Sequence, residues 1–249
     1  MNVPKEAIRW FASKLGYDVR SAASIGVSPF SDMQKFVSAQ SPPMILDVGA
    51  NEGQSIARFK KTFPSSIIHS FEPGRAAFQR LSENAQAYTG VHLWNCAVGA
   101  SAGKRVLFEN TNTDMSSFFT LSSAGWGQVE GESLVEMTTM DDFLKTNGIE
   151  KVDILKSDTQ GYDYEVLKGA EEAMQANRIG LIYFEFIFSD MYEKLPPFDR
   201  VFRHLIDRNF ALVSMYDFRH QDELASFADM LFVNRDYHTS RLTSVLKGA

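Results

Sequence analysis

The chain has 249 residues, 44% of them hydrophobic, and its 31 acidic side chains outnumber the 25 basic ones, which suits one large globular domain with a formal charge of −6. This acidic balance, with Lys and Arg scattered, argues against a nucleic-acid-binding surface, because phosphate binding needs clustered cations. The single cysteine, Cys96, excludes an internal disulfide, and no run of about 18 apolar residues occurs, so we expect a cytoplasmic protein without stable membrane insertion.

Residues 1–42 are predicted to form a short helical extension ahead of the main domain. Pro4 and Gly16 bracket a segment with apolar residues at helical spacing, and a second helix is expected over 31–39, before a Pro-Pro pair. These helices are candidates for capping a binding pocket, touching a membrane or packing on the sheet. We favour packing, because the basic face typical of a membrane-surface helix is thin here.

From residue 43 onward, strands and helices alternate regularly, as in a parallel sheet with crossover helices. The missing crossover helix between the last two strands predicts an antiparallel hairpin at that edge. The expected fold class is therefore α/β, with a Rossmann-like, seven-stranded, mostly parallel sheet in one domain over 43–249. The predicted strands are 44–48, 66–71, 91–95, 152–157, 180–186, 210–216 and 229–233, and the predicted helices are 54–63, 74–87, 162–175 and 198–208.

The first strand, Met44–Val48, runs into a tight turn bracketed by Gly49 and Gly53, and a helix is expected directly after it. A strand, a turn and a helix N-terminus form a nucleotide-sized pocket, and glycine at position 49 would let the backbone come close to a ligand. Neither common phosphate-binding pattern fits. Asn51 and Gln54 stand where a dinucleotide motif needs glycine, and the Lys-Ser or Lys-Thr pair of a P-loop is missing.

Two acids near this turn narrow the choice of ligand. Asp47 precedes the turn, and Glu72 follows the second predicted strand, about 20 residues beyond the glycines, where an acid accepts hydrogen bonds from ribose hydroxyls. A nucleoside without phosphate needs an acid near its positive groups and no anion-binding nest. S-adenosylmethionine, with its ammonium and sulfonium groups, fits that description.

The segment between the third and fourth predicted strands interrupts the alternation. Residues 104–109 and 133–138 have strand character, and between them lies a polar, glycine-containing stretch with isolated aromatic residues. A connection this long is usually functional or disordered, so we interpret 109–132 as a mobile flap over the acceptor site. The alternative is a solvated hairpin loop. The side chains that could stack on a substrate or close the pocket are Met115, Phe118, Phe119 and Trp126.

Five segments resemble, in order, the successive motifs of the FkbM-type methyltransferases, a Rossmann-like family that uses S-adenosylmethionine. They are ILDVGANEGQ, HSFEPGRAAFQRL, NCAVG, LKSDTQGYDYEVLKGA and FEFIFSDMYEKLPPFDRVFRHL. The chain departs from the family pattern at Ser157, where an aliphatic residue is common, and at Gln160, where glutamate is common. The resemblance places Asp158 close to the reacting centre, and it implies cofactor contacts at Asp47, Gly49, Ala50, Asn51, Gly53, Glu72, Asn95, Ala97 and Asp158.

Three residues are candidates for catalysis. Asp158 follows a central strand and could act as a general base or orienting group, ligate a divalent metal, or cap the next helix. Glu185 lies in an apolar strand, and burying an unpaired carboxylate is costly, so we expect it to line the cleft. Two acids alone do not make a hard-cation site, so no metal is assigned. His220, expected on a loop after the sixth strand, is the one histidine considered as a base.

These features together predict an S-adenosylmethionine-dependent methyltransferase, and the resemblance implies O-methylation of a sugar, glycan or natural-product hydroxyl. An N-methyl or carboxyl acceptor stays open. One alternative is a nicotinamide-dependent oxidoreductase on the same architecture, and another is a non-catalytic Rossmann-like binding module. The expected partners are a small-molecule or glycan acceptor and, as an option, further copies of the chain in a homo-oligomer.

Overall fold

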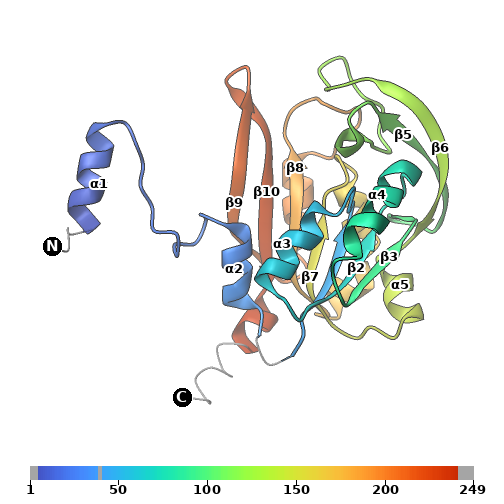
Figure 1. Ribbon diagram of the computed structural model, residues 1–249, viewed down its shortest axis with the longest axis horizontal. Coiled ribbons are helices and arrows are strands. Elements are labelled where there is room, and N and C mark those ends of the chain that lie inside the picture. The colour runs from blue at the N-terminus through green and yellow to red at the C-terminus, as the bar shows by residue number, and fades with distance from the viewer. Residues whose placement is uncertain (1–4, 39–40, 241–249) are drawn as a thin grey trace.

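A seven-stranded sheet forms the centre of the computed structural model, which describes residues 5–38 and 41–240 (Figure 1). The strand order is β3-β2-β1-β7-β8-β10-β9, in which the first five strands are parallel and β10 is antiparallel to both neighbours. This order confirms the predicted fold class and its antiparallel edge. The strands are β1 (Met44–Val48), β2 (Ile67–Phe71), β3 (Val91–Trp94), β7 (Val152–Ser157), β8 (Ile179–Ile187), β9 (Phe210–Gln221) and β10 (Leu224–Asn234).

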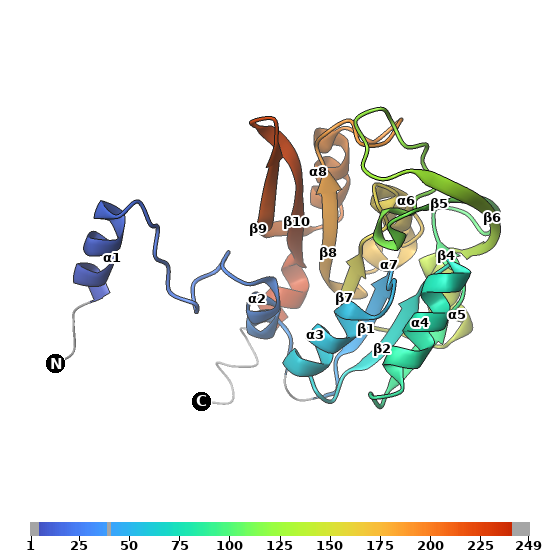
Figure 2. The same ribbon diagram turned by 45° about the horizontal axis from the view of Figure 1, so that its top comes forward.

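Helices cover both faces of the sheet, as its apolar central strands require (Figures 1 and 2). Because side chains alternate along a strand, Ile45 and Leu46 of β1 belong to two different hydrophobic cores. The core on the Ile45 side includes Phe59, and the core on the Leu46 side includes Phe143. The first core is covered by α2 (Pro29–Phe36), α3 (Gln54–Thr62) and α4 (Arg75–Ala85), and the second by α5 (Met140–Thr146), α6 (Asp163–Lys168), α7 (Glu171–Gln175) and α8 (Phe198–Ile206).

The single helix predicted over 162–175 is divided into α6 and α7. Gly169 lies at the break, and a Cβ at this position would come within 2.1 Å of the carbonyl oxygen of Gly99. Two backbone segments distant in the sequence therefore touch at this point, which leaves no room for a side chain. The helix α5 also lies outside the predicted elements.

A second, smaller sheet follows β3 and contains the predicted strand segments 104–109 and 133–138. It consists of β4 (Ala97–Val98), β5 (Gly103–Asn110) and β6 (Val129–Thr138) in the order β4-β6-β5, with β5 and β6 antiparallel. Between β5 and β6, the chain forms the short helix η1 (Thr113–Met115) and then folds back on the body. Ser117 bridges to Phe108 there, and Leu121 bridges to Tyr192. Most of residues 115–122 are thus packed on the molecule, whereas most of residues 123–132 are exposed.

The two N-terminal helices differ from each other in their packing. The first, α1 (Lys5–Lys14), buries none of its residues and stands apart from the body, so the expectation that it packs on the sheet is wrong (Figures 1 and 2). The second, α2, starts at Pro29 after the capping residue Ser28, two residues earlier than predicted, and packs on α3. Pro4 and Ala39, the expected first and last residues of these helices, lie outside the described residues. Within the described ranges, no helix is long and apolar enough to cross a membrane.

Candidate active site

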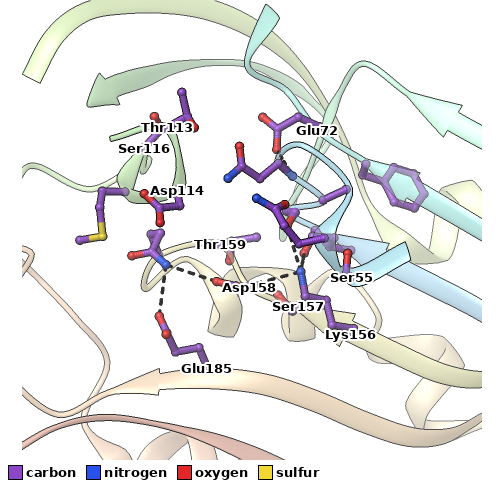
Figure 3. A pocket seen from close by; sticks show the side chains of 18 of the residues that line it. Ser55, Glu72, Thr113, Asp114, Ser116, Lys156, Ser157, Asp158, Thr159 and Glu185 are labelled. Atoms are coloured by element: carbon purple, nitrogen blue, oxygen red, sulfur yellow. Dashed lines mark hydrogen bonds and ion pairs between the residues drawn. The ribbon is translucent and has the colours of Figure 1, made fainter. Parts of the chain in front are cut away.

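A cleft of about 560 Å³ opens at the carboxyl ends of β1, β2, β7 and β8, where open parallel sheets bind their ligands (Figure 3). Its size is typical of a small-molecule site. The turn after β1 and the end of β2 line one part, and the end of β7, Glu185 of β8 and the 109–132 flap line the rest. Of the predicted site residues, those that line the cleft are Gly49, Ala50, Asn51, Glu72, Ala97, Asp158 and Glu185.

The turn after β1 needs glycine for a reason other than the predicted one. Gly49 has a φ of 73°, and a Cβ there would lie 1.9 Å from the carbonyl oxygen of Asp158. The expected space for a ligand is therefore a contact between two backbone segments. Asn51 also adopts a left-handed conformation, with a φ of 45°, and its buried Oδ1 has no hydrogen-bond partner in the described part of the chain. Because an unsatisfied buried acceptor is unfavourable, a ligand that donates to Asn51 would be stabilised.

Asp47 lies beneath the turn, outside the residues that line the cleft, so its predicted cofactor contact stays a prediction. The side chain is fully buried in β1. It accepts hydrogen bonds from the hydroxyls of Ser55 at 2.5 Å and Ser70 at 3.2 Å, and the Lys156 ammonium lies 3.1 Å from its second oxygen. Asp47 therefore ties β1 to β2, β7 and the start of α3.

Lys156 joins the two halves of the site. Its buried Nζ donates to the carbonyl oxygen of Gly49 at 2.9 Å, and it lies 3.8 Å from Oδ2 of Asp158. Burial alone would lower the pKa of Lys156, but the nearby carboxylates of Asp47 and Asp158 raise that pKa above its ordinary value. The side chain is therefore a fixed cation that holds the turn and Asp158 in place.

Glu72 closes the other side of the turn. Its two carboxylate oxygens accept backbone N–H bonds from Asn51 at 2.9 Å and from Gly74 at 2.8 Å. Burial raises the pKa of Glu72, while these two bonds and Lys156 oppose that rise. The carboxylate is fixed at the rim of the cleft and retains further lone pairs for a ligand, as a ribose-binding acid requires.

Two further predicted cofactor residues support the cleft without lining it. Asn95 donates from its side-chain amide to the carbonyl oxygens of Glu72 and Pro73, so it holds the loop between β2 and α4. Gly53 is buried at the N-cap of α3 with a φ of 96°. Both were predicted from the resemblance as direct contacts, and the structure places both behind the lining. Next to them, an apolar wall suited to a flat base consists of Cys96, Ala97, Val98, Leu107 and Phe118.

Asp158 and Glu185 lie at the end of the cleft opposite Glu72 (Figure 3), and the side chain of Gln160 connects these two acids. Its side-chain Nε2 donates to Oδ1 of Asp158 and to Oε2 of Glu185, at 3.2 Å each. The side chain of Asp158 is 45% exposed, which leaves it accessible to an acceptor. At position 160, where glutamate is common in the family, glutamine donates hydrogen bonds to two carboxylates. A glutamate there would place a third carboxylate beside them.

The helix-capping role considered for Asp158 is not found. The N-cap of α6 is Tyr162, which makes no side-chain capping bond. The short-range bonds of this loop go to Asp163 instead, which accepts from Ser157 Oγ at 2.5 Å and from the backbone N–H of Thr159 at 3.2 Å. Asp158 is thus free to face the cleft.

Like charges crowd this end of the site. Burial, together with the carboxylates of Asp158, Asp163 and Asp229, raises the pKa of Glu185 well above its ordinary value. Asp229 accepts a hydrogen bond from the Tyr183 hydroxyl at 2.5 Å, and burial is the main cause that raises the pKa of Asp229 to about 6. Both partners of this pair line the cleft. Glu185 therefore holds its proton more tightly than an ordinary glutamate does, and its protonated form can donate a hydrogen bond.

The 109–132 flap is tied to the loop that carries Asp158. Ser117 donates to the carbonyl oxygen of Gln160 at 2.8 Å, and the hydroxyl of Tyr192 lies 3.0 Å from the carbonyl oxygen of Met115 and 3.2 Å from Oε1 of Gln160. Phe119, expected to face a substrate, packs on Tyr162 instead. The predicted flap side chains that do line the cleft are Met115, Phe118 and Trp126.

The proposal of His220 as a base does not fit the structure. His220 lies in β9, paired with Ala225 of β10, and it is exposed and outside the cleft lining. It was expected on a loop, but the β9–β10 hairpin extends beyond both predicted strands. In the described ranges, no group of three or more His, Cys, Asp or Glu side chains is arranged to hold a metal ion.

Lys156, Tyr183 and Asp229 were not singled out by sequence analysis. Strand alternation could have indicated the first two, because Lys156 stands two residues before Asp158 and Tyr183 two residues before Glu185. Asp229 pairs with Glu185 across β8 and β10. That register depends on the pairing of two strands distant in sequence, which no local pattern reveals.

The fold and the cleft define an α/β protein that binds a nucleoside-type ligand beyond the ends of its parallel strands. A family model described as the methyltransferase FkbM domain matches residues 47–212. The chain belongs to the FkbM methyltransferase family, as the resemblance implied.

Three curated relatives illustrate the range of the family. The chain is 29% identical over 163 residues to the 2-O-methyltransferase NoeI of Sinorhizobium fredii. The match covers 61% of this chain and 66% of the relative. It is 28% identical over 156 residues to the 31-O-demethyl-FK506 methyltransferase FkbM of Streptomyces tacrolimicus, and this match covers 52% of the chain and 60% of the relative. It is 24% identical over 139 residues to the hexuronic acid methyltransferase AglP of Haloferax volcanii, and this match covers 55% of the chain and 54% of the relative. Each match spans less than two thirds of the relative's length.

S-adenosylmethionine is the methyl donor that family membership implies, and the lining of the cleft fits it. Glu72 stands where ribose hydroxyls would be bound, next to the apolar wall for the adenine. The unpartnered Oδ1 of Asn51 and the Asp158 carboxylate can receive polar and positively charged groups. When bound, this cofactor supplies an electrophilic methyl carbon.

Proposed function

We propose that this protein is an O-methyltransferase that transfers the methyl group of S-adenosylmethionine to a hydroxyl of a sugar, glycan or natural product. The observation that carries the proposal is a single cleft with a nucleoside-binding end at Glu72 and a partly exposed acid, Asp158, at its other end. The relatives support the acceptor class, since their names describe a 2-O-methyltransferase, a hexuronic acid methyltransferase and an enzyme for a demethylated FK506 position.

In the proposed reaction, Asp158 takes the proton of the acceptor hydroxyl as the oxygen–carbon bond forms and the sulfur–carbon bond breaks. Lys156, whose ammonium lies 3.8 Å from Oδ2 of Asp158, keeps this carboxylate oriented. Glu185 offers a hydrogen-bonding carboxyl group to a second acceptor hydroxyl, while Gln160 fixes its position relative to Asp158. Proximity and proton transfer are thus supplied by the loop after β7 and by β8.

Calorimetric titration of the purified, cofactor-stripped protein tests this proposal first. We expect S-adenosylmethionine and S-adenosylhomocysteine to bind with dissociation constants on the order of micromolar, a free energy near −8 kcal/mol, and NADH not to bind. Binding of NADH alone would support the oxidoreductase alternative. A folded protein that binds neither adenosyl ligand would overturn the proposal.

The acceptor class is tested by release of S-adenosylhomocysteine in the presence of sugar nucleotides, glycans and their amino-sugar counterparts. Release that depends on a hydroxyl acceptor supports O-methylation. Release only with the amine-bearing members of each pair would replace it with N-methylation. Binding of the cofactor without release on any acceptor would favour the binding module.

A further inference from the structure

A surface of exposed apolar side chains surrounds α1. Apolar residues at positions 7, 8, 11, 12 and 15 share one face of the helix, and the chain returns over 17–19 to complete a shallow groove with them. We call the residues Ile8, Phe11, Leu15, Tyr17 and Val19 the α1 surface. Their exposed fractions lie between 41% and 69%. Such a cluster of large exposed apolar side chains commonly marks a binding surface.

The charge around this surface is opposite to that of the whole molecule. Residues 5–20 contain four basic and two acidic side chains, whereas the whole chain has six more acids than bases. On a helix with 3.6 residues per turn, Lys5 and Lys14 fall on either side of the apolar face. Trp10 is 64% exposed and lies against Lys14, whose Nζ is 5.7 Å from the ring centroid. Aromatic residues and basic residues beside an apolar face are typical of helices that lie in a membrane interface.

The size of the helix argues against a second copy of the chain as the binding partner. A ten-residue helix is about 15 Å long and about 10 Å wide, so one face offers far less than the roughly 800 Å² that each partner of a stable dimer buries. A lipid surface has no such requirement, because single apolar side chains insert between headgroups.

We propose that α1 binds the surface of an anionic lipid bilayer, lying in its plane with Ile8, Phe11 and Leu15 inserted among the lipids. Lys5 and Lys14, which flank the apolar face, would face the anionic headgroups. The acidic body would be repelled by the same headgroups, so contact is confined to α1. This proposal does not depend on the proposed methyl transfer.

The connection to the body suits such an anchor. The chain is tied to α2 from Ala23 onward, where the Lys35 ammonium donates to the Ala23 carbonyl oxygen at 2.8 Å and the Gly26 N–H donates to Asp32 at 2.7 Å. Residues 17–22 run between the helix and this point in extended or turn conformation (Figure 2). A short tether therefore joins a membrane-binding helix to a fixed attachment point.

Vesicle flotation with the full chain tests the proposal. We expect binding to phosphatidylcholine vesicles that contain about 25% phosphatidylglycerol, no binding to pure phosphatidylcholine, and at least a tenfold loss when salt is raised from about 0.1 to about 0.5 M. The double variant Phe11→Glu, Leu15→Glu should bind at least tenfold less, because two charges replace the inserted side chains.

A matched control separates this effect from a general loss of exposed apolar surface. Leu134 of β6 is 66% exposed, so Leu134→Glu should bind vesicles as the wild type does. Because α1 buries no residue, the double variant should keep the wild-type circular dichroism spectrum. Equal binding by the double variant, or no binding to anionic vesicles, would overturn the proposal. A wild-type dimer in light scattering that the double variant converts to a monomer would identify a second copy as the partner instead.

Discussion

The charged side chains at the two ends of the cleft differ in how they are held. At the cofactor end, each charged group has fixed partners: Asp47 is held by Lys156 and two serines, and Glu72 by two backbone N–H groups. At the other end, the amide of Gln160 joins the carboxyl groups of Asp158 and Glu185, and burial together with nearby carboxylates raises the pKa of Glu185. The first end is thus held by fixed contacts, while in the proposed reaction Asp158 at the second end takes a proton.

The largest effect should follow from removing the proposed proton acceptor. Asp158→Asn keeps the size of the side chain and an oxygen for Gln160, but it cannot take a proton at neutral pH. We expect turnover to fall by roughly 10²–10⁴-fold, with S-adenosylmethionine affinity changed by less than about threefold. Release of S-adenosylhomocysteine and calorimetry measure the two quantities. Asp190→Asn, at an exposed position outside the cleft lining, is the control, and wild-type turnover by a folded Asp158→Asn variant would remove Asp158 from catalysis.

A loss of stability should follow from breaking the fixed charge pairs of the cofactor end. Lys156→Met leaves Asp47 buried without its cation, so we expect the free energy of unfolding to fall by about 3–5 kcal/mol. Lys168→Met removes a partly exposed ion pair with Glu165 and should cost less than about 1 kcal/mol. Urea unfolding measures both. Equal losses in the two variants would contradict a stabilising role for the buried pair of Lys156 and Asp47.

Cofactor affinity should respond to the acid at the rim. In Glu72→Gln, the new amide group would face one of the backbone N–H donors of Asn51 and Gly74, so the turn would lose a hydrogen bond. We expect S-adenosylmethionine to bind about tenfold more weakly, a loss of about 1.4 kcal/mol of binding free energy. Calorimetry provides the measurement. Glu52→Gln, which alters a partly exposed ion pair with Arg80, is the matched control. Unchanged binding by Glu72→Gln would show that this acid does not organise the site.

A pH-dependent effect on stability should come from the buried acid Asp163, which lies near Asp158 and Glu185. Burial raises the pKa of Asp163 from 3.8 to about 6, so the folded state holds its proton more tightly than the unfolded state does. The stability this provides is present below pH 4 and is lost as pH rises to about 6, by on the order of 2 kcal/mol.

Asp163→Asn isolates this contribution. The amide keeps an oxygen for the Ser157 hydroxyl and the Thr159 N–H, but it does not titrate. Urea unfolding of the variant should therefore show a shallower decline between pH 4 and pH 6 than the wild type. Parallel curves would mean that Asp163 is not the group responsible.

Local sequence patterns predicted the sheet and much of the cleft. The apolar run of β1 and the strand that ends before Asp158 are visible without any knowledge of their neighbours, and acids at the ends of such strands meet at one edge. That is why Glu72, Asp158 and Glu185 were predicted to face one pocket. The resemblance added the cofactor and the family.

What the sequence could not show depends on contacts across long separations. Gly169 interrupts a helix because the backbone of Gly99 touches it, and His220 lies in a strand because the hairpin continues past its apolar core. Asp47 was predicted as a cofactor ligand, yet its three partners come from three other elements and enclose it. Whether α1 packs on the sheet likewise depends on the surfaces of distant elements, which the local sequence of the helix does not reveal.

The contact between Gly49 and the backbone of Asp158 has a consequence for how such an enzyme can be redesigned. Any side chain at position 49 would displace the loop that carries Asp158. The turn after β1 and the loop after β7 therefore have to be conserved together in any redesign. New acceptor preferences are better sought in Thr113–Ser116, which line the cleft from the flap. If the proposed acceptor site is right, a library that randomises those positions and keeps Gly49 and the Asp158 loop unchanged should change the choice of acceptor and leave binding of the methyl donor unchanged.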